Sequence, residues 1–528
     1  MAFAVSTRTY ALPGVASGVR LGAFRDVALV GGLLALAGLV RWPNHLLSPQ
    51  FPSVGPTVML ALDVAAGRAY PLADQAPYLG APFLYLLAAV YRVFGASIES
   101  TLAVPWLIGV LTLVPTYLLG RELGGRITGT LAAALLATSP AHTVISSHVP
   151  LSHSATPLLA TTTLWLLARA LLHGEGRSLA LAGLSSGLSL QSHPTVLPLL
   201  AGAASGVIIK RPAWLRSGWL YAALGLALAG YGSLLVHHVQ TRFEIVTDIA
   251  AKQERYLDAD DDADEIAGSG VYLNNLDQLV LSVSRLTAGL ITEEASRTDY
   301  LRDPRLALYT ALALGGVLLS ARAGQPFLLI AIVPAILAPP LLSGKYRPIL
   351  DGRYLMPLVP VAFVGVGLFV GWVARNRLTW RLRGTALGLL AVTTILLILA
   401  PLTLLDRFYR DTLEDGNSNA VYLQTLEQVQ AARIDDEPVL VDPLLRTVKN
   451  VGGGKASANL EWLLAVSDIP FGPFETGAAP PPSTGRLAIL HRTTAATLSN
   501  TLELVPLDGR RIVNRDRLSY RAYRVLPR

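Results

Sequence analysis

The chain has 528 residues, of which 52% are hydrophobic and 15% charged, and its mean hydropathy is +0.47. A single soluble core is excluded, because the apolar residues occur in runs of about 17 to 22, the length of a bilayer span. The absence of cysteine excludes disulfides and thiolate metal sites, and the net charge of +7 indicates membrane topology, with no nucleic-acid partner expected.

The first predicted span begins at Val27, after an N-terminal region that carries Arg8, Arg20 and Arg25 but no signal-peptide cleavage pattern. If the helices simply alternate, the short basic connections between spans all fall on one side, as the positive-inside rule requires. We therefore predict a cytoplasmic N-terminus and, after eleven crossings, an extracytoplasmic C-terminus; thirteen helices would give the same final orientation. The spans are expected at 27–40, 100–119, 127–145, 155–172, 178–191, 194–209, 217–236, 304–320, 325–343, 353–374 and 383–401.

A long outer loop, residues 41–99, follows the first span. It is rich in proline and contains a short amphipathic stretch at 58–66 and a polar tip at 70–74. Two adjacent membrane helices can be joined by a connection of a few residues, so a loop of this length is more than a tight hairpin requires. The apolar stretch 78–94 is predicted to dip into or lie against the outer face, because a further crossing would put the basic connections on the wrong side.

Other polar turns fall on the same outer side. They contain His148, His153 and His193, and a later turn carries several cations before residue 354. Polar groups at membrane depth are costly and tend to mark binding paths, so we expect these turns to enclose one lipid-accessible hollow. The second large outer segment, 237–303, has an acidic run at 258–265 that lacks the EF-hand glycine and glutamate, and an amphipathic helix is predicted at 276–291.

After about residue 405 the apolar runs shorten to strand length. Residues 439–442, 487–490 and 520–525 are predicted strands, and 419–432 a helix. The predicted fold is therefore a polytopic α-helical membrane domain, residues 1–404, followed by a small extracytoplasmic α/β domain, residues 405–528.

Several motifs resemble those of the GT-C superfamily of membrane glycosyltransferases. The resemblance is to the glycosyltransferase family 39-like branch, which includes dolichyl-phosphate-mannose protein mannosyltransferases and aminoarabinose transferases, and it covers roughly residues 20 to 400. It rests on the order and spacing of GRAYPL at 67–72, YLGAP at 78–82, GRELGGR at 120–126, Ser139-Pro140, the stretch from Ser147 to Pro157, LSLQSHP at 188–194 and RYLMPLVP at 353–360.

This resemblance implies a GT-C-like fold with about 11 to 13 transmembrane helices. It implies transfer of a sugar from a polyprenyl-phosphate donor to an acceptor on the extracytoplasmic face, in the plasma (inner) membrane, with membrane lipid as a further partner. The acceptor, which could be a protein, a lipid or a glycan, is left open, as is a divalent metal cofactor, for which no strong ligand motif is present. The candidates for substrate binding are Arg41, Tyr78, His193, Lys345, Tyr346, Arg347, Arg353 and Tyr354.

The chain departs from the family pattern at the position of the catalytic acid. Relatives usually carry an acidic residue in the first outer loop, where this chain has Ser53 and Val54. The candidates to replace it are Asp63, which could face inward, Asp74 in the polar tip, and the histidines His148 and His153, which could act as bases at neutral pH.

Two other functions stay open from the sequence. A catalytically silent relative that only binds a polyprenyl phosphate would share every feature except a working base. A lipid or solute transporter would also be polytopic and basic, but it should show related halves, and we find no such internal repeat.

Overall fold

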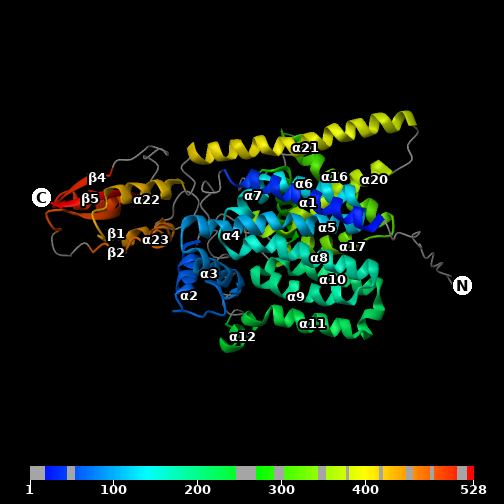
Figure 1. The fold of residues 1–528 in the computed structure, drawn as a ribbon, viewed down its shortest axis with the longest axis horizontal. Coiled ribbons are helices and arrows are strands. Elements are labelled where there is room, and N and C mark those ends of the chain that lie inside the picture. Colours follow the sequence, from blue (N-terminus) through cyan, green and yellow to red (C-terminus); the bar gives the residue numbers. More distant parts are fainter. Residues whose placement is uncertain are drawn as a thin grey trace.

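The structure is a computed structural model that describes residues 18–43, 54–244, 269–290, 302–342, 352–375, 380–414, 420–446, 456–475, 481–507 and 520–528. An elongated helical bundle forms most of it, and a small sheet domain lies at one end (Figure 1). Helix α1 and the other spans run along the bundle axis. Each predicted span is helical in the described residues: α1 (Gly18–Arg41), α4 (Ile98–Leu111), α5 (Leu113–Gly124), α6 (Arg126–Thr138), α7 (Pro140–Ser147), α8 (Thr156–His173), α9 (Gly176–Ser192), α10 (Leu197–Lys210), α11 (Gly218–Gly230), α12 (Gly232–Gln240), α16 (Pro304–Arg322), α17 (Phe327–Leu337), α18 (Pro339–Leu342), α20 (Leu358–Arg375) and α21 (Trp380–Glu414).

Local sequence signals mark where these helices begin and end. Gly174 takes a left-handed conformation, φ 70°, directly after α8. The Ser139 hydroxyl caps the start of α7 by accepting from the His142 amide, with Pro140 at the first helical position.

By length and composition, five described helical segments could cross a membrane, and α11 and α12 make a sixth if their 63° bend lies within one span. The eleven crossings therefore stay a prediction, since several of the other helices are apolar but short.

The basic connections meet at one end of the bundle. Asp26 near the start of α1 pairs with Arg126 at 2.6 Å, and Arg375 at the end of α20 donates to the carbonyl oxygen of Gly124. Arg169 bonds Glu122 of α5 at 3.0 Å, and Arg211 after α10 donates to the Leu171 carbonyl at 2.6 Å. These contacts join the turns at 121–126, 173–176 and 211 with the end of α20, as the alternating arrangement predicted.

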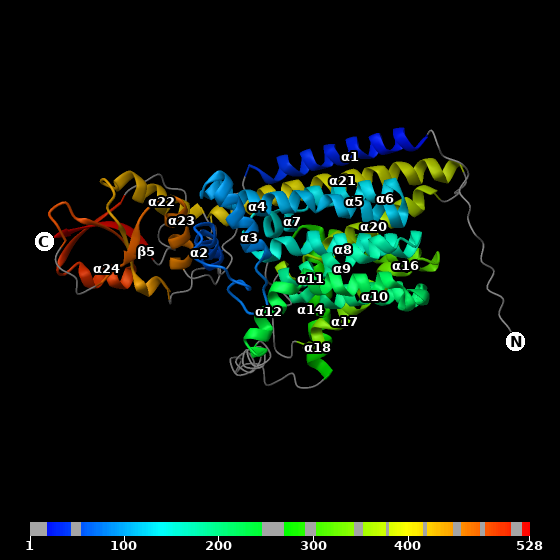
Figure 2. The ribbon, with the colours of Figure 1, turned by 60° about the horizontal axis from the view of Figure 1, so that its bottom comes forward.

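The opposite end carries the first outer loop and the sheet domain. Helices α2 (Val54–Ala65) and α3 (Pro82–Phe94) occupy the two helical stretches predicted in that loop. Val58 and Leu84 share one buried core with Tyr422 and Leu460 of the C-terminal domain, and α2 packs on α23. Figure 2 shows α2, α3 and the sheet at the same end, far from the start of α1.

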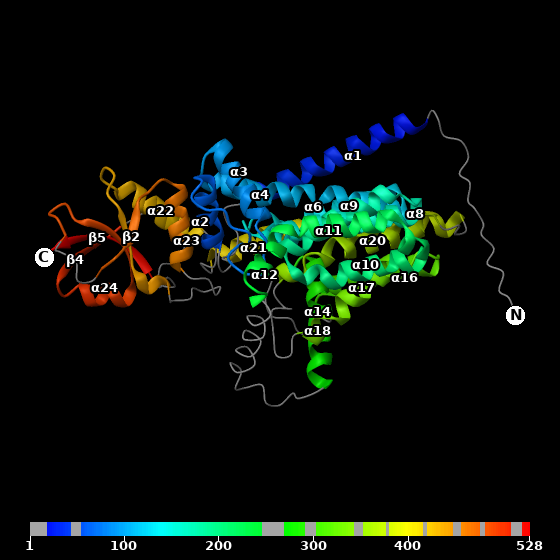
Figure 3. The ribbon, with the colours of Figure 1, turned by 90° about the horizontal axis from the view of Figure 1, so that it is seen from below.

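A helix from the second outer segment packs against the bundle. Helix α14 (Ser269–Ala288) contacts α16, α18 and α20 and the short α19 (Gly352–Leu355), on the side away from α1 (Figure 3). The predicted helix at 276–291 therefore exists and begins several residues earlier. Three short 3-10 turns complete this part of the chain: η2 (Ser152–Ala155), η3 (Pro194–Val196) and η4 (Pro212–Arg216).

The C-terminal domain is a five-stranded mixed sheet with helices, in the order β2-β1-β3-β5-β4. Strand β1 pairs in parallel with β2 and β3, whereas β5 is antiparallel to β3 and β4, with Ala488 opposite Tyr523. The predicted α/β domain is confirmed, with two strands and two helices that the sequence did not reveal. Its elements are α22 (Ala420–Ala432), β1 (Val439–Val441), η7 (Pro443–Arg446), α23 (Ala456–Val466), β2 (Phe471–Pro473), β3 (Arg486–His491), α24 (Arg492–Leu498), β4 (Leu502–Pro506) and β5 (Tyr520–Pro527).

Helix α21 runs without a break from Trp380 to Glu414, through the boundary predicted at residue 404.

Candidate functional site

Three aromatic rings from separate outer turns meet at one place. His153 lies in η2, His193 follows α9, and Tyr354 lies in α19. The ring centroids of His153 and His193 are 4.5 Å apart, those of His193 and Tyr354 4.8 Å, and those of His153 and Tyr354 5.6 Å. Each ring therefore contacts the other two.

Two further predicted residues extend this group. The Tyr78 ring meets His193 edge-on at 5.8 Å, and the Arg353 guanidinium carbon lies 5.1 Å from the centre of the Tyr354 ring. A guanidinium at this distance interacts favourably with the electron-rich ring face. We call Tyr78, His153, His193, Arg353 and Tyr354 the histidine cluster.

His193 is held in one protonation state. Its Nδ1 accepts a hydrogen bond from the Thr195 backbone amide at 3.2 Å, so in the neutral ring Nε2 carries the proton. Burial, and after it the positive charge of Arg353, lowers the pKa of His193 to about 3. The ring is therefore a neutral hydrogen-bond donor at physiological pH.

The His153 ring lacks the partners that a buried imidazole usually has. Both ring nitrogens are buried, and neither has a hydrogen-bond partner in the described part of the chain. Buried polar atoms are nearly always hydrogen-bonded, because an unmet group costs about 1 to 3 kcal/mol. The ring is thus suited to meet a polar group of a ligand.

The first outer loop reaches this cluster through a close backbone contact. The Gly80 amide donates to the Gln191 carbonyl at 2.8 Å, and Ala73 pairs with Gly80 as an isolated bridge. A Cβ on Gly80 would lie 2.1 Å from the Gln191 side-chain oxygen, so only glycine fits here. This contact anchors the loop that carries Tyr78 against the end of α9.

Asp74 is a buried carboxylate in the same loop. It is 8% exposed, accepts from the Thr57 hydroxyl at 3.1 Å and from the Gln75 amide at 2.8 Å, and its own amide donates to the Leu79 carbonyl. Burial raises the pKa of Asp74, and the hydrogen bonds from Gln75 and Thr57 oppose that rise.

Asp63 does not face inward. Its side chain is 45% exposed and pairs with Arg68 at 2.7 Å on the loop surface. The predicted inward orientation is therefore wrong: Asp63 lies on the outer face of α2, and Val58, Ala61 and Val64 fill the buried face.

Arg41 and His148 belong to an internal network rather than to the cluster. Arg41 is fully buried and donates to the carbonyls of Leu136 and Ala137 at 3.0 and 2.7 Å. His148 donates from Nε2 to the Arg41 carbonyl at 2.9 Å and accepts at Nδ1 from the Tyr409 hydroxyl at 3.1 Å. These contacts occupy both imidazole nitrogens, so we assign His148 no proton transfer and Arg41 no phosphate contact.

Some predicted positions lie outside the described residues. These are Ser53, Lys345, Tyr346, Arg347 and the acidic run 258–265. Val54 begins α2 and is buried, so it supplies no acid. Within the described ranges no group of three or more His, Asp or Glu side chains is arranged to hold a metal ion.

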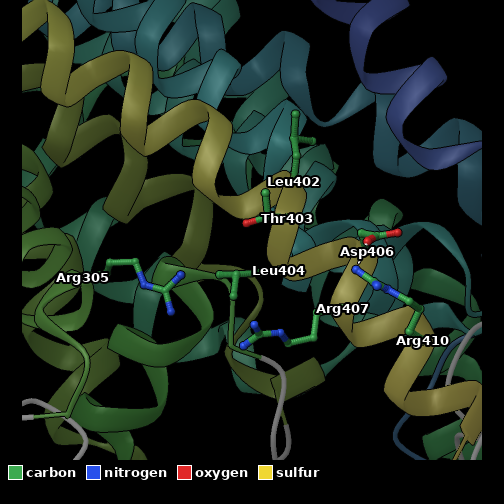
Figure 4. A pocket seen from close by; sticks show the side chains of 7 residues that line it. All are labelled: Arg305, Leu402, Thr403, Leu404, Asp406, Arg407 and Arg410. Atoms are coloured by element: carbon green, nitrogen blue, oxygen red, sulfur yellow. Dashed lines mark hydrogen bonds and ion pairs between the residues drawn. The ribbon is translucent and has the colours of Figure 1, made fainter.

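A separate pocket of about 500 Å³ lies between the start of α16 and the outer half of α21 (Figure 4). Sequence reasoning did not single out its residues. The available signal was the change along α21 from an apolar to an arginine-rich face. The pocket is lined by Arg305, Leu402, Thr403, Leu404, Asp406, Arg407 and Arg410.

Comparisons with known proteins agree with the predicted superfamily. Residues 80–236 match the family model of dolichyl-phosphate-mannose-protein mannosyltransferase. The crystal structure of ArnT from Cupriavidus metallidurans bound to undecaprenyl phosphate has the same fold, with a TM-score of 0.56 over 97% of this chain and 98% of that one, at 12% identity. The chain therefore shares the fold of this structure, and its residues 80–236 carry the match to the mannosyltransferase family model.

The GT-C fold likeness extends to the ligand-free state of the same neighbour. The apo structure of ArnT from the same organism has a TM-score of 0.53 at 13% identity, over 96% of this chain and 98% of that one. The likeness therefore includes the region of the C-terminal sheet domain. No curated protein sequence matches the chain.

Proposed function

We propose that the chain is a GT-C glycosyltransferase and that it binds the phosphate of a polyprenyl-phosphate sugar donor at the histidine cluster. The observation that carries the proposal is the pair of buried His153 nitrogens that lack partners in the described residues. The structural neighbour that shares the fold is bound to undecaprenyl phosphate, which is a ligand of this chemical class.

Each member of the cluster has a role that its chemistry suits. Arg353 supplies positive charge in a fork that matches phosphate oxygens. The Nε2 proton of neutral His193 donates a hydrogen bond without adding charge, and His153 can donate from one ring nitrogen. Tyr78 and Tyr354 hold these rings in place through their contacts with His193. Lys345, Tyr346 and Arg347 remain predicted contributors.

Asp74 is the candidate general base. It shares the loop of residues 71–80 with Tyr78, and its raised pKa makes it a stronger base than an exposed carboxylate. In the proposed reaction the acceptor hydroxyl oxygen bonds to the sugar anomeric carbon as the bond from that carbon to the phosphate oxygen breaks. The hydroxyl proton passes to Asp74, and the phosphate leaves on the polyprenyl chain.

The proposed orientation places this chemistry outside the cell. The basic end, with Arg121, Arg126 and Arg211, would face the cytoplasm of the plasma (inner) membrane, as the positive-inside rule requires. The histidine cluster, the first outer loop and the sheet domain would then be extracytoplasmic. The acceptor, whether protein, lipid or glycan, would approach from that side.

A His153→Phe variant tests donor binding directly. Phenylalanine keeps the ring contact with His193 but removes both nitrogens, so polyprenyl phosphate should bind about tenfold more weakly to protein in nanodiscs. The melting temperature should stay the same or rise, because an unmet buried polar group is lost. His173→Phe, at the basic end, is the matched control. Unchanged binding by His153→Phe would contradict the proposed site.

Turnover is tested with a panel of polyprenyl-phosphate sugars and candidate acceptors, by following release of polyprenyl phosphate. We expect the wild-type chain to release polyprenyl phosphate when a donor is present, and the Asp74→Asn variant to lose this release. Tight polyprenyl-phosphate binding without release from any donor would instead favour the catalytically silent alternative.

A further inference from the structure

The pocket at α16 and α21 is a cationic cavity apart from the histidine cluster, and the two share no residue. Three arginines line it: Arg305 from α16, and Arg407 and Arg410 from α21 (Figure 4). Among the described residues, Asp406 is the one carboxylate of the lining. Even when Asp303, which pairs with Arg305, is counted as well, cations outnumber carboxylates by three to two.

The arginines differ in how far they are already engaged. Arg305 is bound by Asp303, with its Nε 2.8 Å from Oδ1, and Arg410 pairs with Asp406 one helical turn away. Arg407 is exposed and has no hydrogen bond or ion pair with any described residue. A guanidinium on a cavity wall that has no carboxylate partner among the described residues favours an anionic ligand, and its planar fork matches phosphate oxygens.

The face of α21 that carries these groups changes character along the helix. Val392, Ile395, Leu396 and Leu399 are each more than half exposed and recur at helical spacing. One turn further on, the same spacing brings Thr403, Asp406 and Arg410, which are also exposed. An exposed apolar stripe that gives way to charged side chains is expected where hydrocarbon meets lipid headgroups.

The opposite face of α21 is occupied by the protein. Leu405 and Tyr409 are buried against Val144 of α7, and the Tyr409 hydroxyl bonds His148. The pocket face of the helix is therefore turned away from the internal network. Within the pocket, Leu402 and Leu404 supply apolar surface beside the arginines.

We propose that this pocket binds the phosphodiester of an anionic phospholipid of the surrounding bilayer. The headgroup phosphate contacts Arg407 and Arg410, and the acyl chains lie along the apolar stripe from Val392 to Leu399. The proposal does not depend on the donor site, because it uses none of the histidine-cluster residues.

The test is lipid retention by the full chain. The protein is placed in nanodiscs that contain equal amounts of phosphatidylglycerol and phosphatidylcholine with identical acyl chains. It is then released from the nanodiscs, and the lipids that stay bound to it are measured by native mass spectrometry. Wild type should retain phosphatidylglycerol preferentially. Arg407→Gln should lower that preference several-fold and Arg407→Gln with Arg410→Gln about tenfold, as expected for lost charge-assisted contacts.

Three comparisons make the test specific. Arg302→Gln removes the same charge near the start of α16 but outside the pocket lining, so it should retain lipid as wild type does. Asp406→Asn removes a carboxylate that repels the phosphate, so it should increase retention. His153→Phe should leave retention unchanged.

Four results would overturn the proposal. They are equal retention of both lipids by wild type, unchanged retention by the double variant, an equal loss in Arg302→Gln, and displacement of phosphatidylglycerol by undecaprenyl phosphate, which would assign the pocket to the donor instead.

Discussion

The imidazole rings of His153 and His193 lie 4.5 Å apart, centroid to centroid, with their planes tilted by 34°. Two protonated rings at this distance would repel each other, and the nearby guanidinium of Arg353 would repel both. The arrangement is compatible with a pair of neutral histidines next to one permanent cation. Within the histidine cluster, the positive charge for a bound phosphate then comes from Arg353.

The pH dependence of donor binding follows from this arrangement. Because the pKa of His193 is about 3, the ring stays neutral above that pH, and its titration should not change affinity between pH 5 and 8. A ring with the ordinary pKa of 6.5 would instead gain charge, and affinity, as the pH fell through that value. Affinity for a polyprenyl phosphodiester, whose phosphate does not titrate in this range, should therefore be flat. A rise in affinity toward pH 5 that disappears in His193→Gln would contradict the prediction.

Asp74 and Asp63 form a matched pair for testing the base. Asp74→Asn keeps the size and most hydrogen bonds of the buried side chain but cannot accept the acceptor proton, so turnover should fall by about 10² to 10⁴ with donor affinity retained. Asp63→Asn breaks only an exposed ion pair with Arg68, a contact of little energetic value, and turnover should stay the same. Equal losses in both variants, measured as kcat, would exclude Asp74 as the base.

The Thr57 hydroxyl provides a second test of Asp74 that uses pH. It donates a hydrogen bond that favours the charged carboxylate and so lowers the pKa of Asp74. Thr57→Val removes this donor and should raise that pKa further. The base must be deprotonated, so the acid limb of kcat/KM should move to higher pH. Thr130→Val removes an exposed hydroxyl that bonds only within α6 and should leave the limb in place. If the acid limb of kcat/KM stayed in place in Thr57→Val, the titration of Asp74 would not be its cause.

The sequence predicted the helices of the membrane domain because apolar runs of membrane length and short basic turns are local signals. It also predicted the outer turns that bring His153, His193 and Tyr354 together, since the alternation of helices decides which turns share a face. Side-chain roles within that face depended on contacts that no local pattern encodes. The sequence made His148 a candidate base, but the hydroxyl that bonds its Nδ1 belongs to Tyr409, 261 residues later in the chain. Asp63 and Asp74 were both candidates for the base, because the loop sequence does not reveal how far each side chain is buried. In the structure Asp74 is buried and Asp63 is exposed.

The bond between Tyr409 and His148 should contribute to stability rather than to catalysis. Tyr409→Phe leaves the buried His148 Nδ1 without its donor and should lower the free energy of unfolding by about 1 to 3 kcal/mol. Activity of the folded fraction should be nearly unchanged. Melting temperature and kcat of the same preparation measure both effects. A large loss of kcat in protein with an unchanged melting temperature would return His148 to the list of catalytic candidates.

Gly80 should control how closely the first outer loop approaches the histidine cluster. A methyl group at this position would lie 2.1 Å from the side-chain oxygen of Gln191, which is itself held by a hydrogen bond from Ser233, so either the loop or Gln191 must move. Gly80→Ala should therefore cost about 1 to 3 kcal/mol through overpacking and weaken donor binding by shifting Tyr78 from His193. Gly225→Ala, in α11, meets no atom within 4 Å and should be neutral or slightly stabilising, because alanine favours the helix. If Gly80→Ala bound donor as wild type does, contact between this loop and α9 would not set the geometry of the site.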